Sequence, residues 1–150
     1  MGIKGLIAGF VFERPAKTLT LAQLAANLGT TGQRIEQGMA SADDTPANRE
    51  KARHVIGIER WGQSRLQIAL GEQLVMDEYD GYRPSPDLDL RSLQAEFHAA
   101  RQDTIALAQK IEEAGAGDRL VLHNDFGDLS VRGWLQYLGG HASLESKRIK

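Results

Sequence analysis

The sequence predicts an all-α protein. Aromatic residues make up only 6% of the 150 residues, and the alternation of β-branched residues that is typical of strands is scarce. In four separate stretches, apolar residues instead recur at steps of three and four, which is the periodicity of a helix with one buried face. The chain length is a common size for a single domain. We therefore expect one domain, residues 1–150, with four helices.

The first helix is expected to begin after Thr20. Thr20 is a suitable N-cap, and Gln23 stands three residues later, which is the spacing of a capping box. Gly29 and Gly32 weaken the middle of this helix. Its apolar face consists of Leu21, Leu24, Leu28, Ile35 and Met39.

Turn residues delimit the second helix. Thr45 as a cap and Pro46 at the first helical position predict a helix over residues 46–70 that ends at Gly71. The following segment, 71–86, is longer than the links that join antiparallel neighbours in a bundle. Its length therefore permits a crossover from one end of the molecule to the other.

A predicted loop separates the third and fourth helices. The third helix follows the prolines of the preceding segment and ends at Gly115, and residues 115–127 have the composition of a loop. The fourth helix runs from there to the C-terminus. The candidate N-caps are Asp87 or Asp89 for the third helix and Asp128 or Ser130 for the fourth.

Composition and charge exclude several classes of protein. The chain has no cysteine and a net charge of −2, which excludes disulfides, thiolate metal sites and a strongly basic surface for nucleic acid. The longest apolar run, from Gly5 to Phe12, is too short to span a membrane and lacks the pattern of a signal peptide. We expect a cytoplasmic protein without nucleic-acid or membrane partners, in which residues 1–17 form a lead-in that packs on the helices.

The fourth helix carries the strongest candidates for a metal site. His141 and Glu145 share one stripe with Trp134, at steps of three and four residues. Because they are one turn apart, both side chains can reach a single metal ion; the alternative is that Glu145, near the chain end, lies in water. His98 lies off its helix's apolar stripe and His123 lies in a polar loop, so neither is expected to be a ligand, although His123 could shape the mouth of a pocket.

The second helix offers two further candidates. His54 borders the apolar sector of this helix, where a histidine is either a ligand or a hydrogen-bonded structural residue. Glu59 lies in the same sector. It is either a carboxylate that orients an imidazole or the salt-bridge partner of an arginine such as Arg53 or Arg132.

Two stretches of the chain carry a family resemblance. They are NREKARHVIGIERWG, residues 48–62, and FGDLSVRGWL, residues 126–135, followed by His141. Together they resemble the DinB-like family, also called the DinB/YfiT-like metalloenzymes, over residues 18–150 in helix order and spacing. The resemblance implies a four-helix bundle with a long crossover after the second helix. It also implies a divalent-metal site made by one histidine of the second helix and a His-x-x-x-His of the fourth.

On this resemblance, His54 and His141 match two of the three ligand positions, and Glu145 stands where the family has a histidine. The departure either gives a site of two histidines and one carboxylate, suited to zinc, nickel or iron, or leaves the site unable to hold metal. Glu59 remains a substitute ligand or a group that orients one.

The family's implied activities are of two kinds. Some members are similar to thiol-dependent transferases, in which a metal holds a small thiol as the thiolate that attacks an electrophile. Others are regarded as hydrolases, in which the metal lowers the pKa of water and a carboxylate such as Glu59 serves as the base. The resemblance thus implies a homodimeric transferase or hydrolase of a small molecule, with a divalent metal and, for the transferase, a low-molecular-weight thiol as cofactors.

An alternative of a different class is a bundle that has lost its metal through Glu145 and serves as a binding or dimerisation module. It predicts no metal and no effect of changing His54. Its contact surface would consist of Tyr79, Tyr82, Leu6, Ile7, Phe10, Val11 and Phe12.

Overall fold

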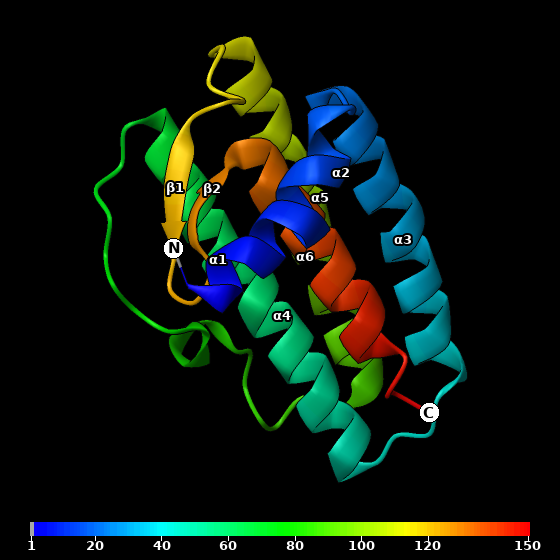
Figure 1. The fold of residues 1–150 in the computed structure, drawn as a ribbon. Helices are drawn as coiled ribbons and strands as arrows, with labels where there is room; N and C mark the ends of the chain where they lie inside the picture. Colours follow the sequence, from blue (N-terminus) through cyan, green and yellow to red (C-terminus); the bar gives the residue numbers. More distant parts are fainter. Residues whose placement is uncertain (1) are drawn as a thin grey trace.

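A computed structural model describes residues 2–150, which form a mostly helical fold with one small two-stranded sheet (Figure 1). The predicted all-α class is confirmed at this level. None of the helices in the described part of the chain combines the length and apolarity needed to cross a membrane. The elements in order are α1 (Ile3–Ala8), the π-helical turn η1 (Gly9–Glu13), α2 (Arg14–Lys17), α3 (Leu21–Ser41), α4 (Pro46–Leu66), the 3₁₀ turns η2 (Gln67–Leu70) and η3 (Tyr79–Tyr82), α5 (Leu90–Glu113), β1 (Leu120–His123), β2 (Gly127–Ser130) and α6 (Val131–Ser146).

The four long helices pack side by side (Figure 1). Both α3 and α4 pack against α5 and against α6. Their inward faces form two clusters of buried side chains, one that includes Trp61 and Trp134 and another that includes Ile35 and Phe97. The apolar stripes of the sequence therefore form the core.

The capping geometry confirms the predicted starts of these helices. Thr20 Oγ1 accepts a hydrogen bond from the Gln23 N–H, and the Gln23 side chain accepts one from the Thr20 N–H, which completes the capping box. Thr45 caps α4, because its Oγ1 accepts a hydrogen bond from the Asn48 N–H. Of the alternatives for the other two helices, the caps are Asp89 for α5 and Ser130 for α6.

The prediction that residues 115–127 form only a loop is wrong. Strands β1 and β2 pair antiparallel, with Val121 opposite Leu129, and both side chains are buried. A ribbon of two short strands is stable only when it packs on another element. The buried indole of Trp134 on α6 supplies such a contact, because its Nε1 donates to the Val121 carbonyl oxygen at 2.9 Å. The hairpin therefore depends on a contact from α6, the helix that follows it.

The N-terminal segment α1–η1–α2 lies across α6 (Figure 1). The Glu13 carboxylate ties it to the start of α6, since it accepts hydrogen bonds from both the N–H and the hydroxyl of Ser130, each at 2.8 Å. Of the expected lead-in, residues 3–17 are helical, and Met1 lies outside the described residues. The buried side chains of this segment are Ala8, Phe12 and Ala16.

The segment between η2 and α5 runs back along α4 (Figure 1). Its turn η3 packs against α4 at Gly57, where a Cβ would lie 2.7 Å from Arg83 Cγ and 3.2 Å from the Tyr79 carbonyl oxygen. Glycine at this position lets the segment approach the helix closely. As a result, Tyr79 lies beside His54 on α4.

Candidate active site

The structure brings His54 and His141 together. His54 lies on α4 and His141 on α6, both half-buried, and their ring centroids are 5.2 Å apart with an angle of 54° between the ring planes. The ring of Tyr79 packs edge-on against His54 at 5.0 Å. Two histidines that lie 87 positions apart in the sequence thus form one pair at the contact between α4 and α6.

Burial keeps His141 in its neutral form. It lowers the pKa of His141 to about 4, and the neighbouring His54 lowers it as well, while Glu145 acts in the opposite direction. The Nδ1 atom of His141 is buried and has no hydrogen-bond partner within residues 2–150. A neutral imidazole is the form that binds a metal ion.

The spacing of the two rings fits a shared metal ion. With metal–nitrogen bonds of about 2.1 Å and tetrahedral angles, two imidazole ligands have ring centroids about 5 Å apart. The observed separation between His54 and His141 is 5.2 Å. The spacing of the two rings is therefore compatible with a pair of ligands to one metal ion.

The third predicted ligand does not complete a set of three. Glu145 lies one turn beyond His141, its side chain is 27% exposed, and its Oε2 accepts from Arg148 Nη1 at 3.3 Å. In the described chain, no three His, Asp or Glu side chains converge in an arrangement that could hold a metal ion. The geometry therefore places two of the predicted ligands together without the third.

Glu59 is held in a buried ion pair on another face of α4. Its carboxylate accepts from Arg101 Nε and Nη2 at 2.8 and 3.1 Å and from Thr104 Oγ1 at 2.9 Å, all on α5. The salt bridge that the sequence allowed is present, but the arginines named for it were wrong. Arg53 pairs instead with Glu50, and Arg132 with Asp118. These contacts are those of a structural ion pair rather than of a base beside His54.

A pocket of about 460 Å³ opens beside His141. Its walls are mainly apolar and come from the N-terminal segment, the hairpin loop and α6. Burial raises the pKa of Tyr137 above its usual range, so its phenol stays neutral and can donate a hydrogen bond. The residues around the pocket are Val11, Phe12, Phe126, Tyr137, Gly140, His141, Ser143, Leu144 and Lys147.

His123 is deeply buried, which the sequence did not indicate. It ends β1 rather than lying in a polar loop, and burial lowers its pKa to about 4. Its Nδ1 accepts from the N–H groups of Asp125 (3.0 Å) and Phe126 (3.3 Å), which places the proton on Nε2. The rings packed around it are Trp61, Phe126, Trp134 and Tyr137. His98, by contrast, is exposed and bonds Glu36 through Nδ1 at 2.8 Å.

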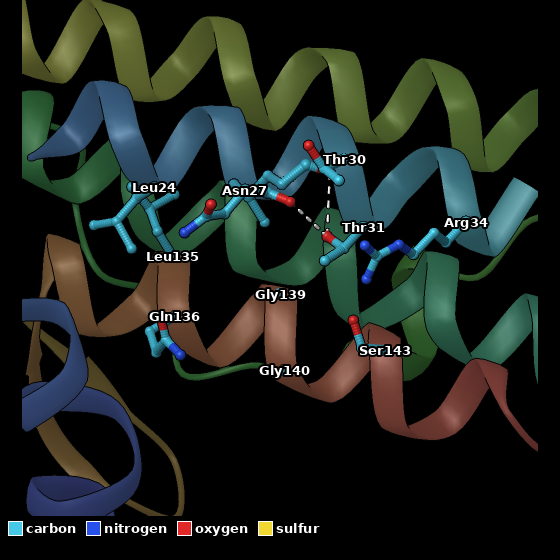
Figure 2. A pocket seen from close by; sticks show the side chains of 11 residues that line it. Leu24, Asn27, Thr30, Thr31, Arg34, Leu135, Gln136, Gly139, Gly140 and Ser143 are labelled. Carbon is cyan, nitrogen blue, oxygen red and sulfur yellow. Dashed lines mark hydrogen bonds between the residues drawn. The ribbon is translucent and has the colours of Figure 1, made fainter. Parts of the chain in front are cut away.

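A second groove of about 410 Å³, lined by both polar and apolar side chains, lies between α3 and α6 (Figure 2). Arg34 and Thr31 of α3 border it on one side, and Gly139 and Ser143 of α6 on the other. The lack of side chains at Gly139 and Gly140 helps to keep it open. His141, one residue further along α6, lines the other pocket, and Gly140 and Ser143 border both hollows, so the two are neighbours along that helix.

Comparisons with protein-family models, with curated proteins and with solved structures found no match to this chain.

Proposed function

We propose that the protein is a divalent-metal-dependent transferase or hydrolase of a small molecule. In this proposal it is a DinB-like four-helix bundle with a crossover between α4 and α5, and His54 and His141 bind the metal. The observation that carries the proposal is the pairing of these two rings at 5.2 Å, with a buried His141 Nδ1 that has no partner in the described chain. Buried polar atoms without partners are uncommon, and a ligand is one explanation of them.

The pocket beside His141 supports a small, largely apolar substrate. Phe12, Phe126 and Leu144 offer apolar surface, and its volume of about 460 Å³ is within the range of sites for small molecules. Tyr137, as a neutral phenol, can donate a hydrogen bond to a polar atom of that substrate. Lys147 at the rim can attract a negatively charged group.

In the proposed site, His54 and His141 hold the metal ion. A divalent ion at His54 and His141 would supply Lewis acidity, which lowers the pKa of a thiol in a transferase or of water in a hydrolase. Both imidazoles must remain neutral to hold it, and burial ensures this for His141.

Metal titration of the metal-free protein tests this proposal. We expect the wild type to bind one equivalent of Zn²⁺, Ni²⁺ or Fe²⁺ by calorimetry. Both His54→Ala and His141→Ala should weaken binding by more than about 100-fold, since loss of a ligand costs more than loss of a supporting group. His98→Ala is the matched control and should bind as the wild type does. Glu145→Gln shows whether this carboxylate completes the site, because the substitution lowers the affinity for the metal only if Glu145 is a ligand.

The second candidate is a metal-free binding module, and the specific observation in its favour is that no third ligand joins the pair within residues 2–150. Failure of the wild type to take up any of the three metals would support it and contradict the enzyme. If metal binds, loss of free bacillithiol or mycothiol in the presence of an apolar electrophile separates the transferase from the hydrolase.

A further inference from the structure

The groove in Figure 2 continues toward the C-terminal ends of α3 and α6. A second hollow, of about 390 Å³, lies there between the same two helices. Thr31, Arg34 and Ser143 line both hollows, so the two are continuous. We call them together the α3–α6 groove.

The charged side chains that line the α3–α6 groove are cations. Arg34 belongs to α3, and Lys147 directly follows α6. Among the described residues that line either hollow, none is an aspartate or a glutamate, although the whole chain has 20 acidic and 18 basic side chains. A concave surface with charges of one sign attracts ligands of the opposite sign. The groove therefore favours an anion.

Neither of these two cations is neutralised within residues 2–150. Other arginines of the chain pair with a carboxylate, as Arg132 does with Asp118. In the described chain, no carboxylate lies within ion-pair distance of Arg34 or Lys147. Figure 2 shows the Arg34 guanidinium turned toward Thr31 and Ser143. Its charge is therefore available to a ligand in the groove.

Uncharged polar groups complete the polar part of the groove. The hydroxyls of Thr30 and Thr31 donate to backbone carbonyl oxygens of their own helix, at 3.2 and 2.9 Å. Within the part of the chain that the structure describes, the side-chain amides of Asn27 and Gln136 and the hydroxyl of Ser143 have no hydrogen-bond partner. Each of these three groups can donate a hydrogen bond to an oxygen atom of a ligand.

The base of the groove is apolar, and glycines keep it open. A Cβ at Gly38 or at Gly140 would have nothing within 4 Å, so both positions face open space. A ligand that fills the groove therefore needs an apolar body as well as an anionic group. The buried apolar side chains at the base are Leu24, Leu28, Ile35, Leu135 and Ile149.

We propose that the α3–α6 groove binds a small organic phosphate. Its phosphate group lies at Arg34 and Lys147, and its apolar body lies along the leucines at the base. A phosphate monoester carries a charge of about −1.5 to −2 at pH 7, which balances both cations, whereas a carboxylate balances only one. The planar guanidinium binds two phosphate oxygens at once, and the lysine ammonium adds a point charge.

This site is separate from the proposed metal site, although the two are neighbours. Gly140, Ser143 and Lys147 also border the pocket beside His141, but Arg34 does not. The proposal depends on the two cations and the shape of the groove, and it requires no metal. Experiments on the metal-free protein therefore test it independently of the proposed function.

Calorimetric titration of the metal-free full chain with phenyl phosphate, at physiological ionic strength, measures the binding. We expect one saturable site with a Kd of about 1 mM or below. Benzoate and benzyl alcohol, which carry less or no charge, should bind at least about 10-fold more weakly. Arg34→Gln and Lys147→Gln should each weaken phenyl phosphate by about 10-fold or more, because each removes charge-assisted hydrogen bonds. Arg91→Gln is the matched control, since Arg91 is an exposed arginine of α5 that lines neither hollow.

Backbone amide chemical shifts locate the bound phosphate. We expect phenyl phosphate to shift the signals of Thr31, Gly38 and Gly139, which line the groove. Shifts confined to Val11 and Phe126 would place the anion in the pocket beside His141 and would overturn the proposal. His141→Ala should bind phenyl phosphate as the wild type does.

A variant that fills the groove tests its shape without changing its charge. Gly38→Phe places an aromatic ring in open space and should weaken phenyl phosphate by about 10-fold or more, because the ring occupies the position of the apolar body. Circular dichroism checks that each variant is folded. Unchanged binding by a folded Gly38→Phe would contradict a ligand that lies along the groove.

Three further results would overturn the proposal. The first is the absence of saturable binding of phenyl phosphate by the wild type up to about 10 mM. The second is an equal loss of affinity in Arg34→Gln and Arg91→Gln, which would indicate a general effect of charge. The third is flotation with phosphatidic-acid vesicles that depends on Arg34, without binding of phenyl phosphate, which would identify a lipid headgroup as the ligand instead of a small soluble molecule.

Discussion

His123 and His141 are neutral because they are buried, whereas His98 lies at the surface beside a carboxylate. Burial lowers the pKa of both His123 and His141 to about 4, since an apolar environment disfavours the charged imidazolium. His98 is exposed and bonds Glu36. The environment of each histidine in the fold therefore decides whether its imidazole is buried and neutral or exposed beside a carboxylate.

We expect the protein to lose stability as the pH falls from about 6.5 to about 4. In the unfolded chain a histidine has a pKa near 6.5, but in the folded chain His123 and His141 have pKa values of about 4. Between these values the unfolded state binds more protons, so the free energy of unfolding falls with the pH, and the contribution is lost below the folded pKa. Urea unfolding of the wild type and of His123→Gln at neutral and acidic pH measures this effect. Between pH 7 and pH 4 the variant should lose about 3 kcal/mol less, and an equal loss would contradict the assignment.

Glu59 and Arg101 form a buried pair whose members depend on each other. Each side chain is only 1% exposed, and the rest of the guanidinium bonds the Leu28 carbonyl oxygen and the Thr31 hydroxyl of α3. The pair thus joins α3, α4 and α5. Removing one member would leave the other as an uncompensated charge.

Glu59→Ala should lower the free energy of unfolding by about 3–5 kcal/mol, measured by urea denaturation. The double variant Glu59→Leu, Arg101→Met should recover much of this loss, since no charge remains buried. If the folded double variant binds metal as the wild type does, Glu59 has only a structural role. A large loss of metal affinity would instead show that Glu59 acts on the histidine pair.

At the scale of elements, the approach of α4 to α6 depends on Gly62. A Cβ at this position would lie 2.5 Å from Leu138 Cδ2, and Leu138 is fully buried. A packed leucine cannot move aside without disturbing its neighbours. The distance between these two helices in turn positions His54 against His141.

Gly62→Ala should therefore destabilise the protein by about 1–3 kcal/mol through overpacking. Gly38→Ala on α3 is the matched control, because nothing lies within 4 Å of a Cβ there and alanine favours the helix by up to about 1 kcal/mol. Thermal and urea unfolding should show changes of opposite sign. A neutral Gly62→Ala would mean that the helix contact tolerates a larger spacing.

At the scale of the whole molecule, Arg65 joins α4 to the hairpin and to the segment before η3. Its guanidinium lies over the Trp61 ring at 4.8 Å and donates to the Leu122 carbonyl oxygen (2.6 Å) and to Asn124 Oδ1 (2.7 Å). The Asp77 carboxylate oxygen Oδ1 lies 3.7 Å from Arg65 Nη2, and the backbone carbonyl oxygen of Asp77 accepts a hydrogen bond from the Trp61 indole. One buried cation thus holds together parts of the chain that no helix connects.

Arg65→Met should release these parts selectively. We expect a loss of about 2–4 kcal/mol of stability, with hydrogen exchange accelerated most in residues 72–83 and in the hairpin. Helices α3 and α5 should keep most of their protection from local opening. Uniform acceleration over all four long helices would indicate that Arg65 supports the core as a whole.

The sequence by itself determined the four long helices and their starts. Caps such as Thr20 with Gln23 act within three residues, and an apolar stripe repeats within one or two turns. Both features can therefore be predicted from a short stretch of sequence. The same periodicity placed His54 at the edge of one apolar face and His141 on the apolar stripe of another helix, which is why both could be singled out as candidates.

Only the tertiary structure decided which faces meet. It gave Glu59 the partner Arg101, where the sequence had suggested Arg53 or Arg132, because α4 packs on α5 at that face. It made residues 120–130 a hairpin and buried His123, because Arg65 of α4 and Trp134 of α6 both bond the backbone of β1. A helical sequence specifies which face of each helix is buried, but the neighbour of that face depends on packing among segments far apart in the chain.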